Sequence, residues 1–182
     1  MILTVKNMVC PRCIMAVEEL LQSKNISVKS ISLGKVETEG EIDAETMAEL
    51  DRLLRELGFE IVRDHNDAVV EQIKAKVIEM ARAGGEEKLS TELASALGMD
   101  YSQVSRIFTA HEERSIEKFY IAHKIERVKE LLEYNELSVK EIAYRLGYSS
   151  VAHLSRQFKQ TTGVTPTEYK QSSIKRKPLT DV

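Results

Sequence analysis

The sequence has no tryptophan, only 2 cysteines and 3 prolines, and no apolar run that approaches the roughly 20 residues of a membrane-spanning helix. Two cysteines are too few for a fold held together by several disulfides. An apolar fraction of 42% and a charged fraction of 30% are typical of a soluble globular protein, and 182 residues suffice for one large domain or two small ones. No signal peptide is visible at the start, so we expect a cytoplasmic protein whose cysteines stay reduced.

Recognisable catalytic patterns are missing as well. The sequence contains no Gly-rich phosphate loop, no pair of acids in a recognisable setting and no motif that pairs a nucleophile with a base. We therefore predict that the protein is not an enzyme.

Charge is distributed unevenly along the chain, although the net charge is only −3. Residues 1–85 carry 11 Lys or Arg against 15 Asp or Glu, whereas residues 140–177 carry 8 against 2. A basic region is the electrostatic signature of nucleic-acid binding. The C-terminal end is therefore the part that we expect to face DNA.

The first part of the chain has the pattern of a small α+β domain. Alternating or apolar stretches predict strands, and helical spacing of apolar residues predicts two helices, the first opened by Pro11 and the second capped by Asp43. The predicted strands cover residues 2–9, 26–33, 35–39 and 59–62. This βαββαβ order is the split βαβ or ferredoxin-like layout.

Everything after a short polar stretch at 63–67 is predicted to be helical. We therefore expect an α+β fold class, with a ferredoxin-like domain followed by an all-α domain. The predicted domains are 1–63, 64–171 and a mobile tail at 172–182.

The helical part contains a repeated helix–turn–helix pattern. The stretch that begins at Leu89 is matched by the one that begins at Leu137, with glycines, Ser-Arg pairs and phenylalanines in the same order. Two such copies argue for two DNA-binding units rather than an ordinary helical hairpin. The matching residues are Leu97-Gly98 with Leu146-Gly147, Ser105-Arg106 with Ser155-Arg156, and Phe108 with Phe158.

A long helix predicted over residues 115–134 joins the two units. Twenty residues span about 30 Å of helix, close to the roughly 34 Å between successive major grooves on one face of DNA. A single chain could therefore place two recognition helices in neighbouring grooves.

This half of the chain resembles the AraC/XylS-type DNA-binding domain over roughly residues 67–171. The most specific stretch runs from Lys140 to Tyr169 and includes Leu146-Gly147-Tyr148, Leu154-Ser155-Arg156-Gln157-Phe158-Lys159 and Gly163-Val164-Thr165-Pro166. The resemblance implies a transcription regulator, usually an activator, that binds double-stranded DNA with two helix-turn-helix units and works with RNA polymerase.

The resemblance also implies which side chains face DNA. Arg can bond guanine, Gln can read adenine, and small apolar groups can meet the thymine methyl. The implied residues of the second unit are Ser150, Val151, Ala152, His153, Ser155, Arg156 and Lys159. Those of the first unit are Ser102, Gln103, Ser105 and Arg106. Four apolar neighbours are expected in the core: Val104, Phe108, Leu154 and Phe158.

The first unit differs from the second in its charge. Residues 86–139, which hold the first unit and the long helix, carry 7 Lys or Arg against 11 Asp or Glu. The loop His111–Arg114 also replaces the Lys/Gly-rich stretch that the resemblance leads us to expect after Phe108. Both features argue against strong DNA contact by the first unit.

The stretch from Cys10 to Cys13 places two thiols where a predicted strand meets a helix, and the helix N-terminus favours their ionised form. Four interpretations are open. A structural zinc site needs four ligands, and the four histidines are remote in sequence. A thioredoxin-like redox pair needs a longer fold, and an incidental CxxC is the third choice. We favour the fourth, a soft ion held by two thiolates, with Cu(I) first and Hg(II) or Zn(II) behind.

The N-terminal 62 residues resemble the heavy-metal-associated (HMA) domain of copper chaperones and metal-pumping ATPases. The matching features are Met8-x-Cys10-x-x-Cys13, the βαββαβ order, and Leu57-Gly58-Phe59 before the last strand. The resemblance implies that Cys10 and Cys13 bind the metal, with Met8 beneath the loop and Phe59 packed near the site.

Together these features predict a DNA-binding transcription regulator, monomeric or weakly dimeric and away from membranes, that senses a soft metal. One alternative is a regulator that responds to redox state through a Cys10–Cys13 disulfide. The other is a metal chaperone whose helical half docks on a protein; a chaperone is also a potential partner for metal delivery.

Overall fold

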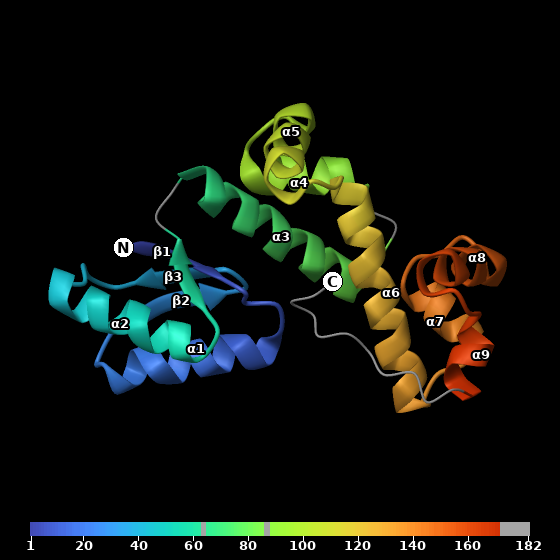
Figure 1. The fold of residues 1–182 in the computed structure, drawn as a ribbon, viewed down its shortest axis with the longest axis horizontal. Coiled ribbons are helices and arrows are strands. Elements are labelled where there is room, and N and C mark those ends of the chain that lie inside the picture. Colours follow the sequence, from blue (N-terminus) through green and yellow to red (C-terminus); the bar gives the residue numbers. More distant parts are fainter. Residues whose placement is uncertain (63–64, 86–87, 172–182) are drawn as a thin grey trace.

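The computed structural model describes residues 1–62, 65–85 and 88–171. It is an α+β protein whose N-terminal domain holds a four-stranded antiparallel sheet in the order β2-β3-β1-β4 (Figure 1). Two helices pack on one face of this sheet, so the predicted βαββαβ order is confirmed. The elements are β1 (Ile2–Lys6), α1 (Pro11–Ser23), β2 (Val28–Ser32), β3 (Lys35–Thr38), α2 (Ala44–Glu56) and β4 (Glu60–Val62).

Alternation along β1 divides the sheet into two faces. Leu3 and Val5 are buried against α1 and α2, together with Val17, Leu21 and other apolar residues of these helices. The first strand is shorter than predicted, because Asn7 adopts a left-handed φ of 71° that turns the chain. Cys10 therefore does not end a strand as expected but lies three residues further on, at the N-cap of α1.

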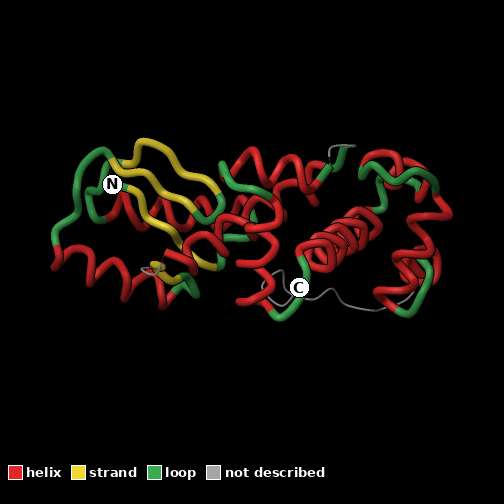
Figure 2. Tube along the Cα trace, turned by 90° about the horizontal axis from the view of Figure 1, so that it is seen from above, coloured by secondary structure: helices red, strands yellow, loops and turns green. Residues whose placement is uncertain are grey.

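The remainder of the described chain is helical, as predicted. Figure 2 shows the sheet and the last helices at opposite ends of an elongated molecule. The predicted domain boundary at 63–64 and the predicted tail at 172–182 lie outside the described residues. The helices are α3 (His65–Ala83), α4 (Leu89–Leu97), α5 (Tyr101–Glu112), α6 (Ile116–Tyr134), α7 (Val139–Arg145), α8 (Val151–Thr162) and α9 (Pro166–Gln171).

The long helix α6 lies between two hydrophobic cores. Its first turn belongs to the core formed by α3, α4 and α5, and its second half to the core of α7, α8 and α9. Because neighbours surround it, α6 buries polar residues as well, including His123 and Lys124. The helix therefore connects the two helix-turn-helix units and packs against both, as Figure 1 shows.

The internal repeat extends further than the sequence indicated. Phe108 packs against Phe119 with ring centroids 5.4 Å apart, and Phe158 packs against Tyr169 at 5.6 Å. The helices that carry the second ring of each pair, α6 and α9, begin in the same way: a Ser115 or Thr165 hydroxyl accepts a backbone N–H three residues on. Each unit therefore contains three helices, and α9 corresponds to the first turns of α6.

One position of this repeat is strained in the first unit. Glu113 has a φ of 53° at the end of α5, where the second unit has Gly163 with a φ of 84°. A side chain in the left-handed region raises the energy of the folded state, whereas glycine occupies that region freely. Replacing Glu113 with glycine should therefore raise the free energy of unfolding by about 0.5–1 kcal/mol in urea titrations. The reciprocal Gly163→Ala should lower it, and an unchanged midpoint in both variants would contradict this reading.

Candidate DNA interface and thiol site

The turn between α7 and α8 is built by local hydrogen bonds. Ser138 and Glu141 form a capping box at the start of α7, in which the Ser138 hydroxyl accepts the Glu141 N–H at 3.2 Å. Gly147, with a φ of 65°, reverses the chain, and the Ser150 hydroxyl then accepts the His153 N–H at 3.1 Å to open α8. Local hydrogen bonds therefore fix where α7 and α8 begin.

Packing decides which face of each second helix is free. Val104, Phe108, Leu154 and Phe158 are all fully buried, which confirms their predicted place in the core. The residues predicted to face DNA lie on the opposite faces. In α8 and its cap, Ser155 is half-buried and the others are exposed: Ser150, Val151, Ala152, His153, Arg156 and Lys159. In α5, Ser105 is half-buried and the others are exposed: Ser102, Gln103 and Arg106.

His153 is held in place by Ser149 and Tyr148, which the sequence did not indicate as site residues. The Ser149 hydroxyl lies 3.1 Å from Nδ1 of His153, and the Tyr148 ring meets the imidazole edge-on with centroids 5.4 Å apart. Tyr148 is held in turn by a 2.8 Å hydrogen bond from its hydroxyl to Gln157. When the Ser149 hydroxyl donates to Nδ1, Nε2 carries the proton and can donate to an acceptor such as a phosphate.

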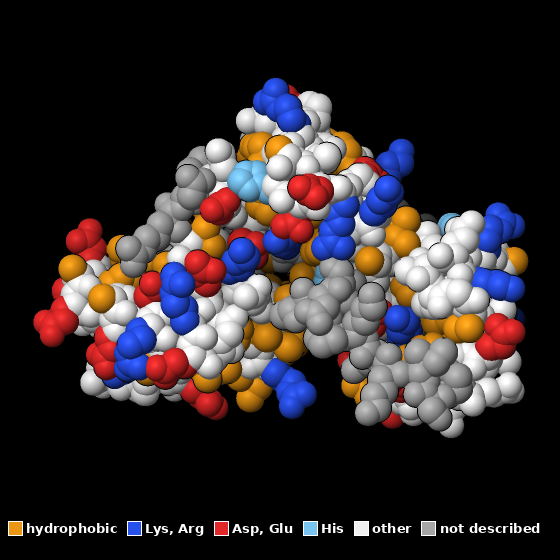
Figure 3. All heavy atoms as spheres, viewed as in Figure 1, with side chains coloured by type: hydrophobic (Ala, Val, Ile, Leu, Met, Phe, Trp, Pro, Cys, Tyr) orange, Lys and Arg blue, Asp and Glu red, His pale blue; other side chains and the backbone are white. Residues whose placement is uncertain are grey.

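The second unit carries exposed cations on each of its three helices. Lys140 and Arg145 lie on α7, Lys159 on α8 and Lys170 on α9. In Figure 3 the end of the molecule that carries α8 shows more Lys and Arg than Asp and Glu side chains on a largely uncharged surface, whereas the N-terminal domain mixes both signs. This distribution suits a helix that approaches the phosphate backbone.

The thiols of Cys10 and Cys13 lie close together at the start of α1. Their sulfur atoms are 3.4 Å apart, and both residues are half-buried. Burial raises the pKa of the Cys13 thiol, and the neighbouring Cys10 thiol adds to this effect. Burial of Cys13 thus opposes the helix N-terminus, which was expected to favour the thiolate. Met8 and Phe59, the predicted neighbours of the site, are buried in the core on which Cys13 packs.

The loop that carries the thiols also touches the helical half of the molecule. Val9, next to Cys10, packs against the core of α3, α4, α5 and the start of α6, and so does Leu33 from the β2–β3 turn. At Gly34 the turn approaches so closely that an added Cβ would lie 3.4 Å from the Cβ of Ala75 on α3. Two loops at one end of the sheet therefore dock on the first helix-turn-helix unit.

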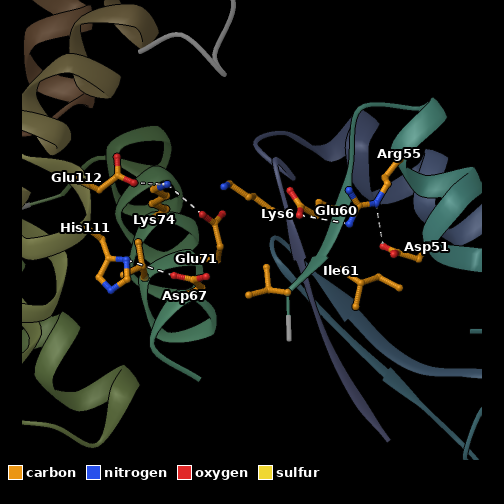
Figure 4. Close-up of a pocket in the computed structure, with 12 residues that line it drawn as sticks. Lys6, Asp51, Arg55, Glu60, Ile61, Asp67, Glu71, Lys74, His111 and Glu112 are labelled. Atoms are coloured by element: carbon orange, nitrogen blue, oxygen red, sulfur yellow. Dashed lines mark hydrogen bonds and ion pairs between the residues drawn. The ribbon is translucent and has the colours of Figure 1, made fainter. Parts of the chain in front are cut away.

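Beside this contact, a charged cleft of about 500 Å³ separates the sheet from α3 and α5. Figure 4 shows its two walls. On the helical wall Lys74 bridges Glu71 at 3.0 Å and Glu112 at 2.5 Å, and on the sheet wall Arg55 pairs with Glu60 at 3.4 Å. Each of these ion pairs stays within one wall of the cleft, and the two loops add apolar packing to the contact between the domains.

Among the described residues, no group of three or more His, Cys, Asp and Glu side chains could hold a metal ion together. Within the described part of the chain, the cysteines therefore form a pair without a third ligand of these types. No described helix is long and apolar enough to cross a membrane.

Comparison with known proteins places the C-terminal part. A helix-turn-helix domain family matches residues 93–172. The chain is 31% identical over 83 residues to the HTH-type transcriptional regulator GlxA of Rhizobium meliloti (strain 1021), which covers 46% of this chain and 26% of GlxA. It is 23% identical over 115 residues to the uncharacterized HTH-type transcriptional regulator YdeC of Bacillus subtilis (strain 168), covering 63% of this chain and 40% of YdeC. The chain thus spans well under half the length of these relatives.

A solved structure shares the fold of the same part. It is the C-terminal domain of AraT, a response regulator from Geobacillus stearothermophilus, with a TM-score of 0.53 and 23% identity over 59% of this chain and 88% of that one. The helix-turn-helix regulators that match this part form a non-enzymatic family, which agrees with the prediction that the protein is not an enzyme. The C-terminal part of this chain is an AraC/XylS-family helix-turn-helix DNA-binding domain.

Proposed function

We propose that this chain is a transcription regulator that binds double-stranded DNA through α8 and senses a soft metal ion, with Cu(I) favoured, at Cys10 and Cys13. The observation that carries the proposal is the position of Val9. It adjoins the first thiol and packs into the core of the first helix-turn-helix unit. A change at the thiols therefore has a direct route to the DNA-binding domain. RNA polymerase and a metal chaperone are the proposed partners in the cytoplasm.

The thiol geometry fits a two-coordinate soft ion after a small movement. Metal–sulfur bonds of about 2.3 Å place two sulfurs up to about 4.6 Å apart in a linear arrangement. The sulfurs lie 3.4 Å apart here, so they must separate by roughly 1 Å. Bound Cu(I) would supply a positive charge that keeps both thiols deprotonated. Zn(II) or Hg(II) could take the same pair, zinc with ligands from elsewhere.

Separation of the thiols would be felt across the domain contact. Cys13 is fixed in the first turn of α1, where its N–H bonds the Cys10 carbonyl at 3.0 Å, whereas Cys10 lies at the end of the loop that contains Val9. The movement should therefore fall mainly on this loop. Close-packed neighbours transmit such displacements instead of absorbing them.

The first test is a Cu(I) titration against a colorimetric chelator. Native protein should bind one equivalent tightly, and the Cys10→Ser/Cys13→Ser variant should lose this binding, because serine is a poor ligand for a soft ion. Met15→Ala, which removes an exposed sulfur from the same helix, is the matched control and should bind normally. Equal binding by native protein and the double serine variant would remove the metal site from the proposal.

The second step measures coupling. If Cu(I) changes DNA affinity by some factor, DNA must change Cu(I) affinity by the same factor. Val9→Ala should keep the Cu(I) affinity but weaken this reciprocal effect, since it trims the contact between the thiol loop and the helical core. A Cu(I) affinity that is the same with and without DNA would exclude coupling through DNA affinity and leave only an effect on polymerase recruitment.

A redox switch is the second candidate, favoured by the 3.4 Å distance between two sulfurs that could also form a disulfide. Mass-spectrometric trapping of a Cys10–Cys13 disulfide at cytosolic redox poise would support it. A metal chaperone docked on a protein would be supported by the lack of salt-dependent binding to any DNA.

A further inference from the structure

The two helix-turn-helix units present different charges at the helix ends that enter a major groove. Asp100 is the N-cap of α5, and its side chain makes no capping hydrogen bond. Glu117, on the first turn of α6, accepts a hydrogen bond from the hydroxyl of Tyr101, the first residue of α5. Two carboxylates therefore lie where the second unit, by the repeat, has the hydroxyls of Ser150 and Thr167.

Both acids are exposed at the end of the first unit that corresponds, by the repeat, to the start of α8. The hydrogen bond from Tyr101 lowers the pKa of Glu117, so its carboxylate stays ionised. The N-terminal residues of a recognition helix approach the base edges, with phosphates on both sides. Carboxylates at that point repel the phosphates. They weaken binding, because electrostatic attraction to phosphates supplies much of the affinity of a protein for DNA.

Two cations of the second unit are not repeated in the first, although Arg156 is matched by Arg106. Lys159 of α8 corresponds to Thr109 of α5, and Lys170 corresponds to Tyr120, which is half-buried. Lys118 is the exception, since it is exposed on α6 where the second unit has Glu168. Arg114 is turned inward, 4.6 Å from the centre of the Phe119 ring and 3.8 Å from Glu112.

The first unit is also the one that the N-terminal domain contacts. Val9 and Leu33 pack on the core that contains Phe108 of α5, whereas the core of the second unit includes no residue of the N-terminal domain among those described. One unit is thus joined to the thiol domain and carries acids at its groove end. The other has no such contact among the described residues and carries exposed cations on all three of its helices.

We infer that this chain reads a single major groove, with α8, and that Asp100 and Glu117 are the residues that keep α5 out of the neighbouring groove. This inference rests on the proposed DNA binding and deepens it. The first unit acts as the surface on which the thiol domain packs. The operator therefore carries one block of specified bases for each chain that binds it.

The test begins with selection of duplexes from a random-sequence pool by the full-length protein. The selected sequences should share one block of bases, and two blocks about 10 base pairs apart would overturn the inference. On the selected duplex, Arg156→Ala should weaken binding by about tenfold or more, whereas Arg106→Ala, the matched change on α5, should alter it less than about twofold.

A gain-of-function variant tests the acids themselves. Asp100→Ser/Glu117→Thr gives the first unit the residues of the second, so binding to a duplex should tighten and the dependence of affinity on salt should steepen as new phosphate contacts form. Glu92→Gln/Asp100→Asn, which alters charge but leaves Glu117, should give a smaller effect. An unchanged salt dependence in the Asp100→Ser/Glu117→Thr variant would contradict the role of these acids.

Two kinds of failure can be separated. If Arg106→Ala and Arg156→Ala weaken binding equally, DNA binding stands and the single-groove inference fails. If the native protein selects no sequence and shows no salt-dependent binding to duplex DNA, the proposed function fails first. Circular dichroism of each variant shows whether a loss of binding reflects a loss of the fold.

Discussion

Replacing Gly147 with alanine should lower the free energy of unfolding by about 3 kcal/mol or more. Gly147 has a φ of 65°, and a Cβ added there would lie 2.1 Å from the carbonyl oxygen of Gly85. Gly84 mirrors this contact, since a Cβ on it would lie 2.3 Å from the carbonyl oxygen of Arg145. The obstacle is backbone on both sides, so no rotamer change can relieve it. Urea unfolding followed by circular dichroism measures the loss.

The internal repeat provides the matched control. Gly98 occupies the corresponding place in the first unit with a φ of 63°, but an added Cβ would meet nothing within 4 Å. Gly98→Ala carries only the left-handed strain and should lower stability by about 1 kcal/mol. Equal losses for Gly98→Ala and Gly147→Ala would show that the approach of the two backbones is not part of the fold in solution.

This contact also bears on DNA binding. The contact between Gly85 and Gly147 holds the chain after α3 against the turn that leads into α8. It therefore helps to fix the orientation of the second unit relative to α6. A Gly147→Ala protein that remains folded at low temperature should therefore bind DNA less well than Gly98→Ala protein, because α8 is less firmly oriented.

Local patterns made most of the fold predictable. Gly98, Gly147 and the capping box of Ser138 mark helix ends through interactions between near neighbours, which a sequence displays directly. The buried positions of Phe108 and Phe158 follow from helical spacing in the same way. The first strand was predicted, but its end at Lys6 was not, because alternation of side chains does not show that Asn7 adopts a left-handed conformation.

Contacts between distant parts of the chain were not predictable in this way. Nothing in the sequence around Val9 shows that it meets the core of the first unit, and the apposition of Gly85 and Gly147 joins segments about sixty residues apart. The pKa of Cys13 was misjudged for the same reason. A helix N-terminus can be read from Pro11, but the burial that opposes it depends on tertiary packing.

The second large effect is a loss of stability in mild acid caused by His123. This residue of α6 is 4% exposed, and its ring lies edge-on to Phe119 with centroids 4.4 Å apart. Burial, together with the positive charge of Arg114, lowers the pKa of His123 to about 4 from an ordinary value of 6.5. In mild acid the unfolded chain therefore binds a proton at His123, whereas the folded chain keeps this histidine neutral. Stability should fall as the pH drops below about 6.5 and level off below about 4, by roughly 3 kcal/mol in total.

His123→Leu isolates this contribution. Leucine fills the space without a titrating group, so the variant should lose much of the decline between pH 6.5 and pH 4 that native protein shows in urea unfolding. His153→Leu, which removes an exposed imidazole from α8, is the control and should keep the native profile.

His123 shares a small cavity with Asn7 and Met8 of the thiol loop and with Glu71, Lys74 and Glu112. Lys74 already pairs with both of these carboxylates. Protonation of His123 would therefore add an unpaired charge at the contact between the thiol loop and the first unit. Acid should loosen that contact before it unfolds the second unit, and identical profiles for native and His123→Leu protein would disprove this account.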